Sequence, residues 1–226
     1  MELNANFDER AVVHAGKLEW KPSPMKGVDR RMLDRLGDEV ARATTIVRYA
    51  PGSHFSPHVH TGGEEYLVLD GVFQDDHGDF PVGSYVRNPP NSSHTPGSEP
   101  GCTIFVKLWQ FDMEDRNQIH VDTANTEWVA DPDRDGVEVM ELYKDDREKV
   151  FLEQWAPGSE VSIEAPEGIE ILVITGGFEE SGEAFEVQSW LRLPRGSSTK
   201  AIAGENGAKV WIKRDHLKET PKPPAV

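Results

Sequence analysis

The sequence repeats itself once, and this internal duplication limits the folds that the chain can adopt. Similar segments recur in the same order, 105 to 108 positions apart. The recurring pairs are 10–14 with 116–120, Trp20 with Trp128, 50–53 with 156–159, 67–73 with 172–178, and 89–93 with 194–198. Ordered matches of this kind indicate two copies of one structural plan. We therefore expect two tandem domains, covering residues 1–115 and 116–226.

Short β-strands are expected in both copies. Residues 43–50 and 103–110 carry β-branched and aromatic side chains at alternating positions, as half-buried strands do. Residues 27–36 could also form a helix, but in the second copy Val137, Val139 and Tyr143 alternate before a polar turn and a second strand. That pattern predicts a hairpin in both copies. With 20 glycines and 16 prolines available for turns, the chain is expected to be all-β.

The composition argues against several kinds of partner. The formal net charge is −16, so neither nucleic acid nor an anionic membrane surface is expected to bind. The N-terminus is polar, and no apolar run approaches the ~18 residues of a membrane helix. The single cysteine, Cys102, allows no intramolecular disulfide. We expect a cytoplasmic protein whose partner is a small-molecule substrate, and the sequence leaves a homo-oligomer open.

Metal-ligating residue types are concentrated between positions 58 and 94. His58 and His60 share one face of a predicted strand, because side chains alternate along it. Glu64 and Glu65 open the next strand, and His94 follows a loop stiffened by two prolines. Three imidazoles and one carboxylate form a chelating set for a divalent first-row metal.

The spacing of these residues resembles the two sequence motifs of the cupin superfamily. The matching positions are Gly52, His58, His60, Glu64, Gly71, Gly83, Pro89 and His94. The sequence departs from the motifs at Asn91, where the family usually has glycine, and at Ser98, where it often has asparagine. The resemblance implies two tandem cupin barrels (double-stranded β-helices, or jelly rolls), with a metal inside the first.

A longer stretch is similar to one branch of that superfamily, the ChrR-like cupins. The similar segments are 63–65, 67–73, 83–90 and 101–108. In that branch, the cupin domain of an anti-sigma factor binds zinc through three histidines and a glutamate. The resemblance therefore implies zinc held by His58, His60, Glu64 and His94. Iron(II) is the alternative, because the same fold hosts dioxygenases that use it.

The choice of carboxylate rests on two conflicting alignments. The six-residue gap to Gly71 and the ChrR-like spacing favour Glu64, whereas alignment of the two repeats places Glu65 opposite Glu170. Neighbours on a strand face opposite sides, so only one of the two can join the histidines. We assign the ligand to Glu64.

The second copy has lost the chelating set. Glu164 and Pro166 stand where the first copy has His58 and His60, and Thr199 replaces His94. We therefore expect one metal per chain, in the first domain, and a second domain that is structural or holds a metal-free pocket.

Four further residues lie outside the predicted ligand set. Tyr85, Arg87 and Lys107 alternate on strands of the first domain, where they could line its pocket or face outward. His216 lies near the proline-rich end and is expected to be exposed.

Two functions of different kinds fit these features. One is a metal-dependent enzyme, such as a dioxygenase acting on a small molecule at an open metal position. The other is a non-catalytic zinc-binding sensor or interaction module, related to the cupin domains of anti-sigma factors.

Overall fold

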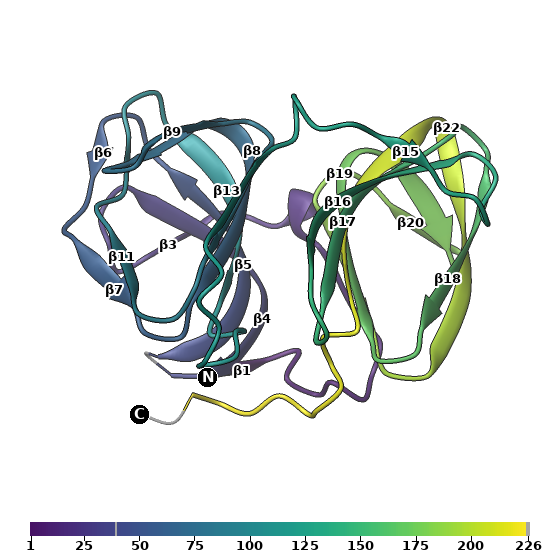
Figure 1. Cartoon of the computed structure of the whole chain (residues 1–226), viewed down its shortest axis with the longest axis horizontal. Helices are drawn as coiled ribbons and strands as arrows, with labels where there is room; N and C mark the ends of the chain where they lie inside the picture. Colours follow the sequence, from purple (N-terminus) through teal and green to yellow (C-terminus); the bar gives the residue numbers. More distant parts are fainter. Residues whose placement is uncertain (39, 225–226) are drawn as a thin grey trace. The chain divides into compact units, whose positions relative to one another are not determined.

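Nearly all regular structure in the chain is β-strand, as expected from the sequence. The computed structural model describes residues 1–38 and 40–224 (Figure 1). Contacts between residues divide it into two units. Unit 1 comprises residues 1–5, 19–125 and 222–224, and unit 2 comprises residues 6–18 and 126–221.

Unit 1 is built on an antiparallel sheet with the order β1-β4-β5-β13-β8-β10-β14. The strands on this path are β1 (Glu2–Leu3), β4 (Val28–Gly37), β5 (Ala41–Tyr49), β8 (Glu64–Asp75), β10 (Ser84–Asn88), β13 (Cys102–Leu108) and β14 (Ile119–Asp122). Shorter strands extend it, namely β3 (Lys21–Pro22), β6 (Ser53–His54), β9 (Gly78–Pro81) and β12 (Gly97–Ser98). A separate two-stranded sheet pairs β7 (His58–His60) with β11 (Ser92–His94).

Unit 2 has the same plan, with the order β15-β16-β17-β22-β19-β21-β2. Its strands are β2 (Ala11–His14), β15 (Val129–Ala130), β16 (Val137–Lys144), β17 (Lys149–Trp155), β18 (Glu160–Ala165), β19 (Ile169–Glu180), β20 (Glu183–Phe185), β21 (Ser189–Leu193) and β22 (Ser197–Arg214). A short 3-10 turn, η1 (Ala15–Lys17), follows β2.

The structure confirms the hairpins that were predicted from the repeat. β4 pairs antiparallel with β5, and β16 pairs antiparallel with β17. Val28 lies opposite Tyr49 in the first hairpin, and Val137 lies opposite Trp155 in the second. These matching registers give a direct correspondence between positions of the two units.

The opening strand of each repeat pairs within the unit formed mainly by the other repeat. β2 lies early in the chain but pairs with β21 of unit 2, with Ala11 opposite Arg192. β14 follows the first repeat and pairs with β10 of unit 1, with Ile119 opposite Arg87. β2 and β14 therefore occupy equivalent sheet positions in opposite units, with Ala11 equivalent to Ile119 and His14 to Asp122. The sequence match of segments 10–14 and 116–120 is thus two positions out of register.

The two cores differ in what fills them. In unit 2, residues such as Val161, Ile163, Ile169, Leu193 and Ile212 form a continuous apolar cluster and are almost fully buried. The corresponding cluster in unit 1 is smaller and rich in aromatic rings. Among the described residues, no helix is long and apolar enough to cross a membrane.

Candidate metal centre

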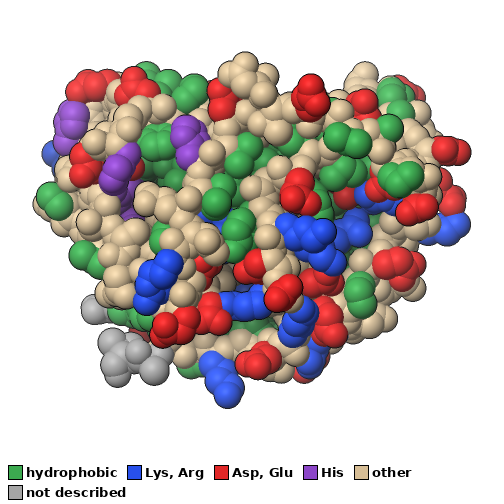
Figure 2. Space-filling model, in the orientation of Figure 1, with side chains coloured by type: hydrophobic (Ala, Val, Ile, Leu, Met, Phe, Trp, Pro, Cys, Tyr) green, Lys and Arg blue, Asp and Glu red, His purple; other side chains and the backbone are tan. Residues whose placement is uncertain are grey.

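Three histidines of unit 1 converge on one point. One ring nitrogen from each of His58, His60 and His94 can be chosen so that all lie within 4.8 Å of one another. The Nε2 atoms of His60 and His94 are 3.0 Å apart. His60 and His94 are buried, whereas His58 is exposed at the edge of the cluster. Figure 2 shows histidine side chains gathered on the unit 1 part of the surface that it draws.

The two-stranded sheet β7–β11 holds these rings together. His58 and His60 are two positions apart on β7, so they share a face, while Val59 between them points outward and is 54% exposed. His94 lies directly opposite His58 across the sheet. The H-x-H pattern thus forms a cluster because a third histidine is paired beside it.

A glycine turn connects β7 to the strand that carries the acidic residues. Gly63 has φ of +77°, a conformation that glycine adopts without strain. Gly62 packs under the ring of Trp109, and a Cβ added at Gly62 would come within 2.0 Å of that ring. The turn therefore requires both glycines, and it sets the short distance between His60 and Glu64.

Asn91 departs from the usual cupin motif, and its backbone explains why the departure is tolerated. Its φ is +69°, in the left-handed region that glycine occupies most easily and asparagine next. Its backbone N–H donates to the carbonyl of His60, which ties the loop before β11 to β7.

The two neighbouring glutamates point in opposite directions. The Oε2 atom of Glu64 lies 3.3 Å from Nε2 of His60 and 3.8 Å from Nε2 of His94. The side-chain amide of Asn88 donates to the same oxygen at 3.3 Å. Glu65 instead accepts a 2.7 Å hydrogen bond from the hydroxyl of Tyr85, on the other side of the sheet. The carboxylate beside the histidines is therefore that of Glu64.

Burial sets the protonation of the cluster. Desolvation, followed by repulsion from His94 and His58, lowers the pKa of His60 to about 3, so its ring is neutral near pH 7. Burial raises the pKa of Glu64, although His94 and Asn88 partly oppose that shift. A metal ion would supply the positive charge that stabilises this buried carboxylate.

Asp75 orients His94, and sequence reasoning missed it. Its Oδ2 atom lies 3.0 Å from Nδ1 of His94, which leaves Nε2 directed at the cluster. Burial opposes ionisation of Asp75, but hydrogen bonds with His94 and the backbone N–H of His77 outweigh it and lower its pKa. The repeat held a signal, because Glu180 occupies the equivalent position 105 residues later.

A cavity of about 320 Å³ adjoins the histidines. His58, His60 and Glu64 form its polar side, and its walls are mainly apolar, with Val47, Tyr49, Phe55, Ile104, Val106 and Leu108 among them. Burial, followed by the charge of Glu64, raises the pKa of Tyr49, so its phenol keeps its proton. Such a cavity can hold a small, largely apolar molecule beside the cluster.

The donor set fits a divalent metal. Neutral imidazoles and a carboxylate suit zinc or iron(II), and Asp75 and Asn88 hold two of the four groups in place. The hydroxyl of Tyr66 is buried, and the described part of the chain offers it no hydrogen-bond partner. Its pKa is raised by burial and then by the nearby charges of Glu64 and Asp75. That unsatisfied hydroxyl is consistent with a further polar occupant near the cluster.

Tyr85, Arg87 and Lys107 lie together with Glu65. Both Arg87 and Lys107 are directly opposite Glu65 on the neighbouring strands, and all three are buried. Arg87 also pairs with Asp115 at 2.8 Å, and Lys107 donates to Thr44 at 2.9 Å. This row, Arg87–Glu65–Lys107, is on the opposite face of the sheet from Glu64.

Unit 2 repeats the buried row but not the histidine cluster. Glu170 lies opposite both Arg192 and Lys213, in the register that Glu65 has with Arg87 and Lys107. His216, expected to be exposed, is instead half-buried, and only 4% of its side chain is exposed. Its Nε2 atom lies 2.9 Å from the Glu170 carboxylate, which draws the ring into the interior.

At the cluster positions of unit 2, the polar groups are replaced. Ile169 takes the place of Glu64, since it lies opposite Leu193 as Glu64 lies opposite Asn88. Thr199, in the place of His94, donates to Glu180 at 2.7 Å. The contact between His94 and Asp75 thus persists in unit 2 as a hydroxyl–carboxylate hydrogen bond.

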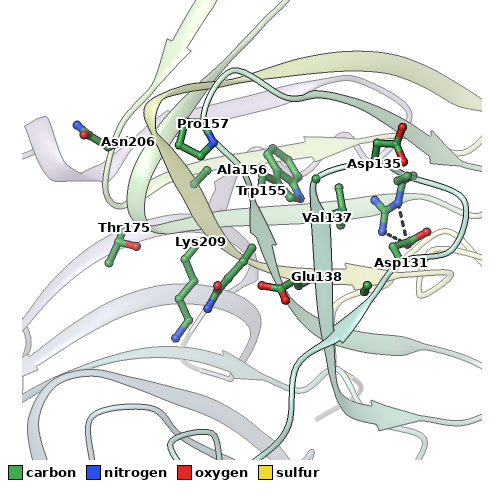
Figure 3. Close-up of a pocket in the computed structure, with 15 residues that line it drawn as sticks. Asp131, Asp135, Val137, Glu138, Trp155, Ala156, Pro157, Thr175, Asn206 and Lys209 are labelled. Atoms are coloured by element: carbon green, nitrogen blue, oxygen red, sulfur yellow. Dashed lines mark hydrogen bonds and ion pairs between the residues drawn. The ribbon is translucent and has the colours of Figure 1, made fainter.

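Unit 2 contains two larger cavities. One, of about 640 Å³, lies beside β16, β17 and β22, and its polar lining includes Glu138, Gln154, Thr175 and Lys209 (Figure 3). The other, of about 550 Å³, is lined by Glu164 and Pro166. The sequence comparison placed these two residues opposite His58 and His60, but the register corrects it. Thr199 lies opposite Ile163 as His94 lies opposite His58, and the carbonyl of Ala165 accepts from the turn backbone as that of His60 does. The counterparts of His58 and His60 are therefore the buried Ile163 and Ala165.

Solved structures of similar fold include an oxalate decarboxylase and a 7S globulin. A candidate dioxygenase from Nostoc punctiforme is 15% identical, with a TM-score of 0.76 over 97% of this chain and 87% of its own. A variant of Bacillus subtilis oxalate decarboxylase is 11% identical, with a TM-score of 0.65 over 91% and 77%. The 7S globulin of Momordica charantia is 10% identical, with a TM-score of 0.62 over 91% and 84%. Such low identities establish the tandem cupin fold alone.

Sequence comparison identifies the family. None of the curated proteins is similar enough in sequence to count as a match. The family model of the ChrR cupin-like domain matches twice, at residues 8–112 and 116–218. The chain therefore belongs to the ChrR cupin-like family and carries two copies of its domain, of which the first contains the histidine cluster.

Proposed function

We propose that unit 1 holds one divalent metal through His58, His60, Glu64 and His94, and that the metal serves a reaction on a small molecule. The observation that carries this proposal is the convergence of four donors, three of which, His58, His60 and Glu64, line a largely apolar cavity. An enzyme needs such a cavity beside its metal, whereas a purely structural site is closed on all sides.

Dioxygenation is the reaction class that we favour, with iron(II) as its metal. Iron(II) would supply the redox change that reaction with oxygen requires, which zinc lacks. The apolar walls would exclude water and hold the hydrophobic part of a β-dicarbonyl or enol substrate. Tyr49 would donate a hydrogen bond to a substrate oxygen, since its phenol stays protonated.

The test compares two metal-loaded forms of the same protein. After chelation, the chain is reloaded with iron(II) or zinc, and oxygen consumption is measured with a panel of dicarbonyls and enols. The iron form should consume oxygen and the zinc form should not. Nitric oxide should give an electron paramagnetic resonance signal with the iron form if a coordination position is open.

The alternative function is a zinc-binding sensor or interaction module. Four protein donors suffice for tetrahedral zinc, which favours this alternative. A protein that retains zinc, forms no nitric-oxide adduct as the iron form and turns over none of the panel would support it.

A further inference from the structure

The 550 Å³ cavity of unit 2 overlaps in part with the position that the histidine cavity has in unit 1. Glu164 and Pro166 line it, whereas Ile163 and Ala165, the counterparts of His58 and His60, are buried in the apolar core. Arg214 lines the unit 2 cavity and lies opposite Ile169, as Leu108 lines the other and lies opposite Glu64. Unit 2 therefore has the guanidinium of Arg214 at the position where unit 1 has the apolar side chain of Leu108, opposite Glu64.

Most charges around this cavity are already compensated. Arg134 donates to Asp131 at 2.7 and 2.9 Å and to Glu153 at 2.8 and 3.0 Å. The dashed lines at Asp131 in Figure 3 mark part of this network. The indole of Trp155 also donates to Glu153, at 2.8 Å. At the other side, Lys149 pairs with Asp215 at 2.7 Å.

Arg214 is less well compensated than these charged groups. Its Nη2 atom is 3.4 Å from Glu153, which is a long contact for a charge-assisted hydrogen bond. Its Nε atom is buried, and no hydrogen-bond partner for it exists in the described part of the chain. Burial lowers the pKa of Arg214, although the charge of Glu153 opposes this shift. A buried N–H of a guanidinium without an acceptor is costly, so a site of this kind favours an added acceptor.

We propose that this cavity binds a small monocarboxylate with an apolar body, without a metal, through the guanidinium of Arg214. A carboxylate would supply the missing acceptor, and Val139, Phe151 and Pro132 offer apolar walls for the rest of the ligand. Glu141 and Glu164 line the same cavity and are exposed. Their negative charges disfavour a second carboxylate on the ligand, which selects monoanions over dianions.

The experiment titrates the full chain, in the presence of a metal chelator, with benzoate, its neutral isostere benzamide, and the dianion terephthalate. Binding is followed by calorimetry and by the methyl signals of Val139 in nuclear magnetic resonance spectra. Benzoate should give saturable shifts, and benzamide and terephthalate should bind about tenfold more weakly or less. Arg214→Gln and Arg214→Lys should both weaken benzoate binding by about tenfold or more.

Two matched variants test whether benzoate binds in this cavity rather than elsewhere on the protein. Lys200→Gln removes an exposed lysine paired with Glu160 and should leave benzoate binding unchanged. His94→Ala should also leave it unchanged, so this proposal can fail or hold independently of the metal site. Absence of saturable shifts with benzoate, equal binding of benzamide, or undiminished binding by both Arg214 variants would overturn the proposal. If Arg214→Gln fails to fold, the lysine variant and the comparison of benzoate with benzamide still decide.

Discussion

The two units share the buried row on one face of the sheet and differ on the other. Arg87, Glu65 and Lys107 in unit 1 match Arg192, Glu170 and Lys213 in unit 2, residue by residue and in the same register. The face with the histidine cluster has instead changed from His58, His60, Glu64 and His94 to Ile163, Ala165, Ile169 and Thr199. A duplicated fold thus keeps the polar groups that its buried interior needs, while the groups that serve a site can be replaced one by one.

The strongest way to test this contrast is to remove the ligands of unit 1. His58→Ala, His60→Ala and His94→Ala should each remove most of the bound metal, because each deletes one of four donors. Elemental analysis of the wild type should give one equivalent per chain. The matched change in unit 2, Thr199→Ala, should leave that equivalent in place. Two tightly held equivalents, or full retention by all three histidine variants, would contradict the assignment.

The shared row predicts a comparable effect in both units. Arg87→Met and Arg192→Met each leave a buried glutamate without its opposite arginine. Loss of one partner from a buried ion pair lowers the free energy of unfolding by about 3–5 kcal/mol. Urea denaturation would measure it.

The control for the row is an exposed pair. Lys200→Met breaks the contact with Glu160 at the surface and should cost no more than about 1 kcal/mol. Arginine variants as stable as this control would show that the row contributes little.

Asp75 and Glu180 sharpen the comparison, because they are equivalent acids with different neighbours. Asp75→Asn should weaken metal binding about 10- to 100-fold, since the carboxylate that orients His94 is lost. Competition with a chromogenic chelator would measure the affinity. Glu180→Gln should leave that affinity unaltered, and an equal loss in both variants would point to a general structural effect.

The smallest effect concerns the pH dependence of unit 2. Burial disfavours the charged form of Glu180, but hydrogen bonds from Ser181, Thr199 and Arg10 outweigh it and lower its pKa. A lowered pKa in the folded state adds stability above the ordinary value near 4.5, and that stability is lost as the pH falls through the lowered value. Glu180→Gln should therefore reduce the free energy of unfolding by at most about 2 kcal/mol at pH 7.

That loss should shrink towards zero in strong acid. Denaturation midpoints of the wild type and Glu180→Gln, compared at both extremes of pH, would show the change. A difference that is independent of pH would rule out a contribution from the charge.

Much of the fold was predictable because the sequence contains two copies of the same pattern. The hairpin of residues 28–49 was ambiguous alone, and the clearer alternation of Val137, Val139 and Tyr143 decided it. The histidine cluster was predictable because H-x-H places two rings on one face and a stiff loop brings a third. The ligand role of Glu64 stays a prediction, although its carboxylate lies beside the rings.

Other features depend on contacts that spacing does not encode. Arg87 and Lys107 were considered as pocket residues because alternation gives a face but not which face is the interior. Arg192 and Lys213 stand at the equivalent positions of unit 2, which lacks the histidine cluster. Their presence there would have indicated that the row is structural. His216 was expected to be exposed because it lies near the proline-rich end, yet its ring lies 2.9 Å from the carboxylate of Glu170, 46 positions earlier.

The placement of β2 has a consequence for how the protein is made. His14 at the end of this strand meets Ser189 across 175 positions of chain. At a synthesis rate of about 5–20 residues per second, β2 emerges roughly 10 to 35 seconds before β21 does. During that interval β2 has been synthesised but β21, the strand with which it pairs, has not. Unit 2 thus cannot be completed as a separate co-translational step, and its last sheet pairing depends on a segment that left the ribosome early.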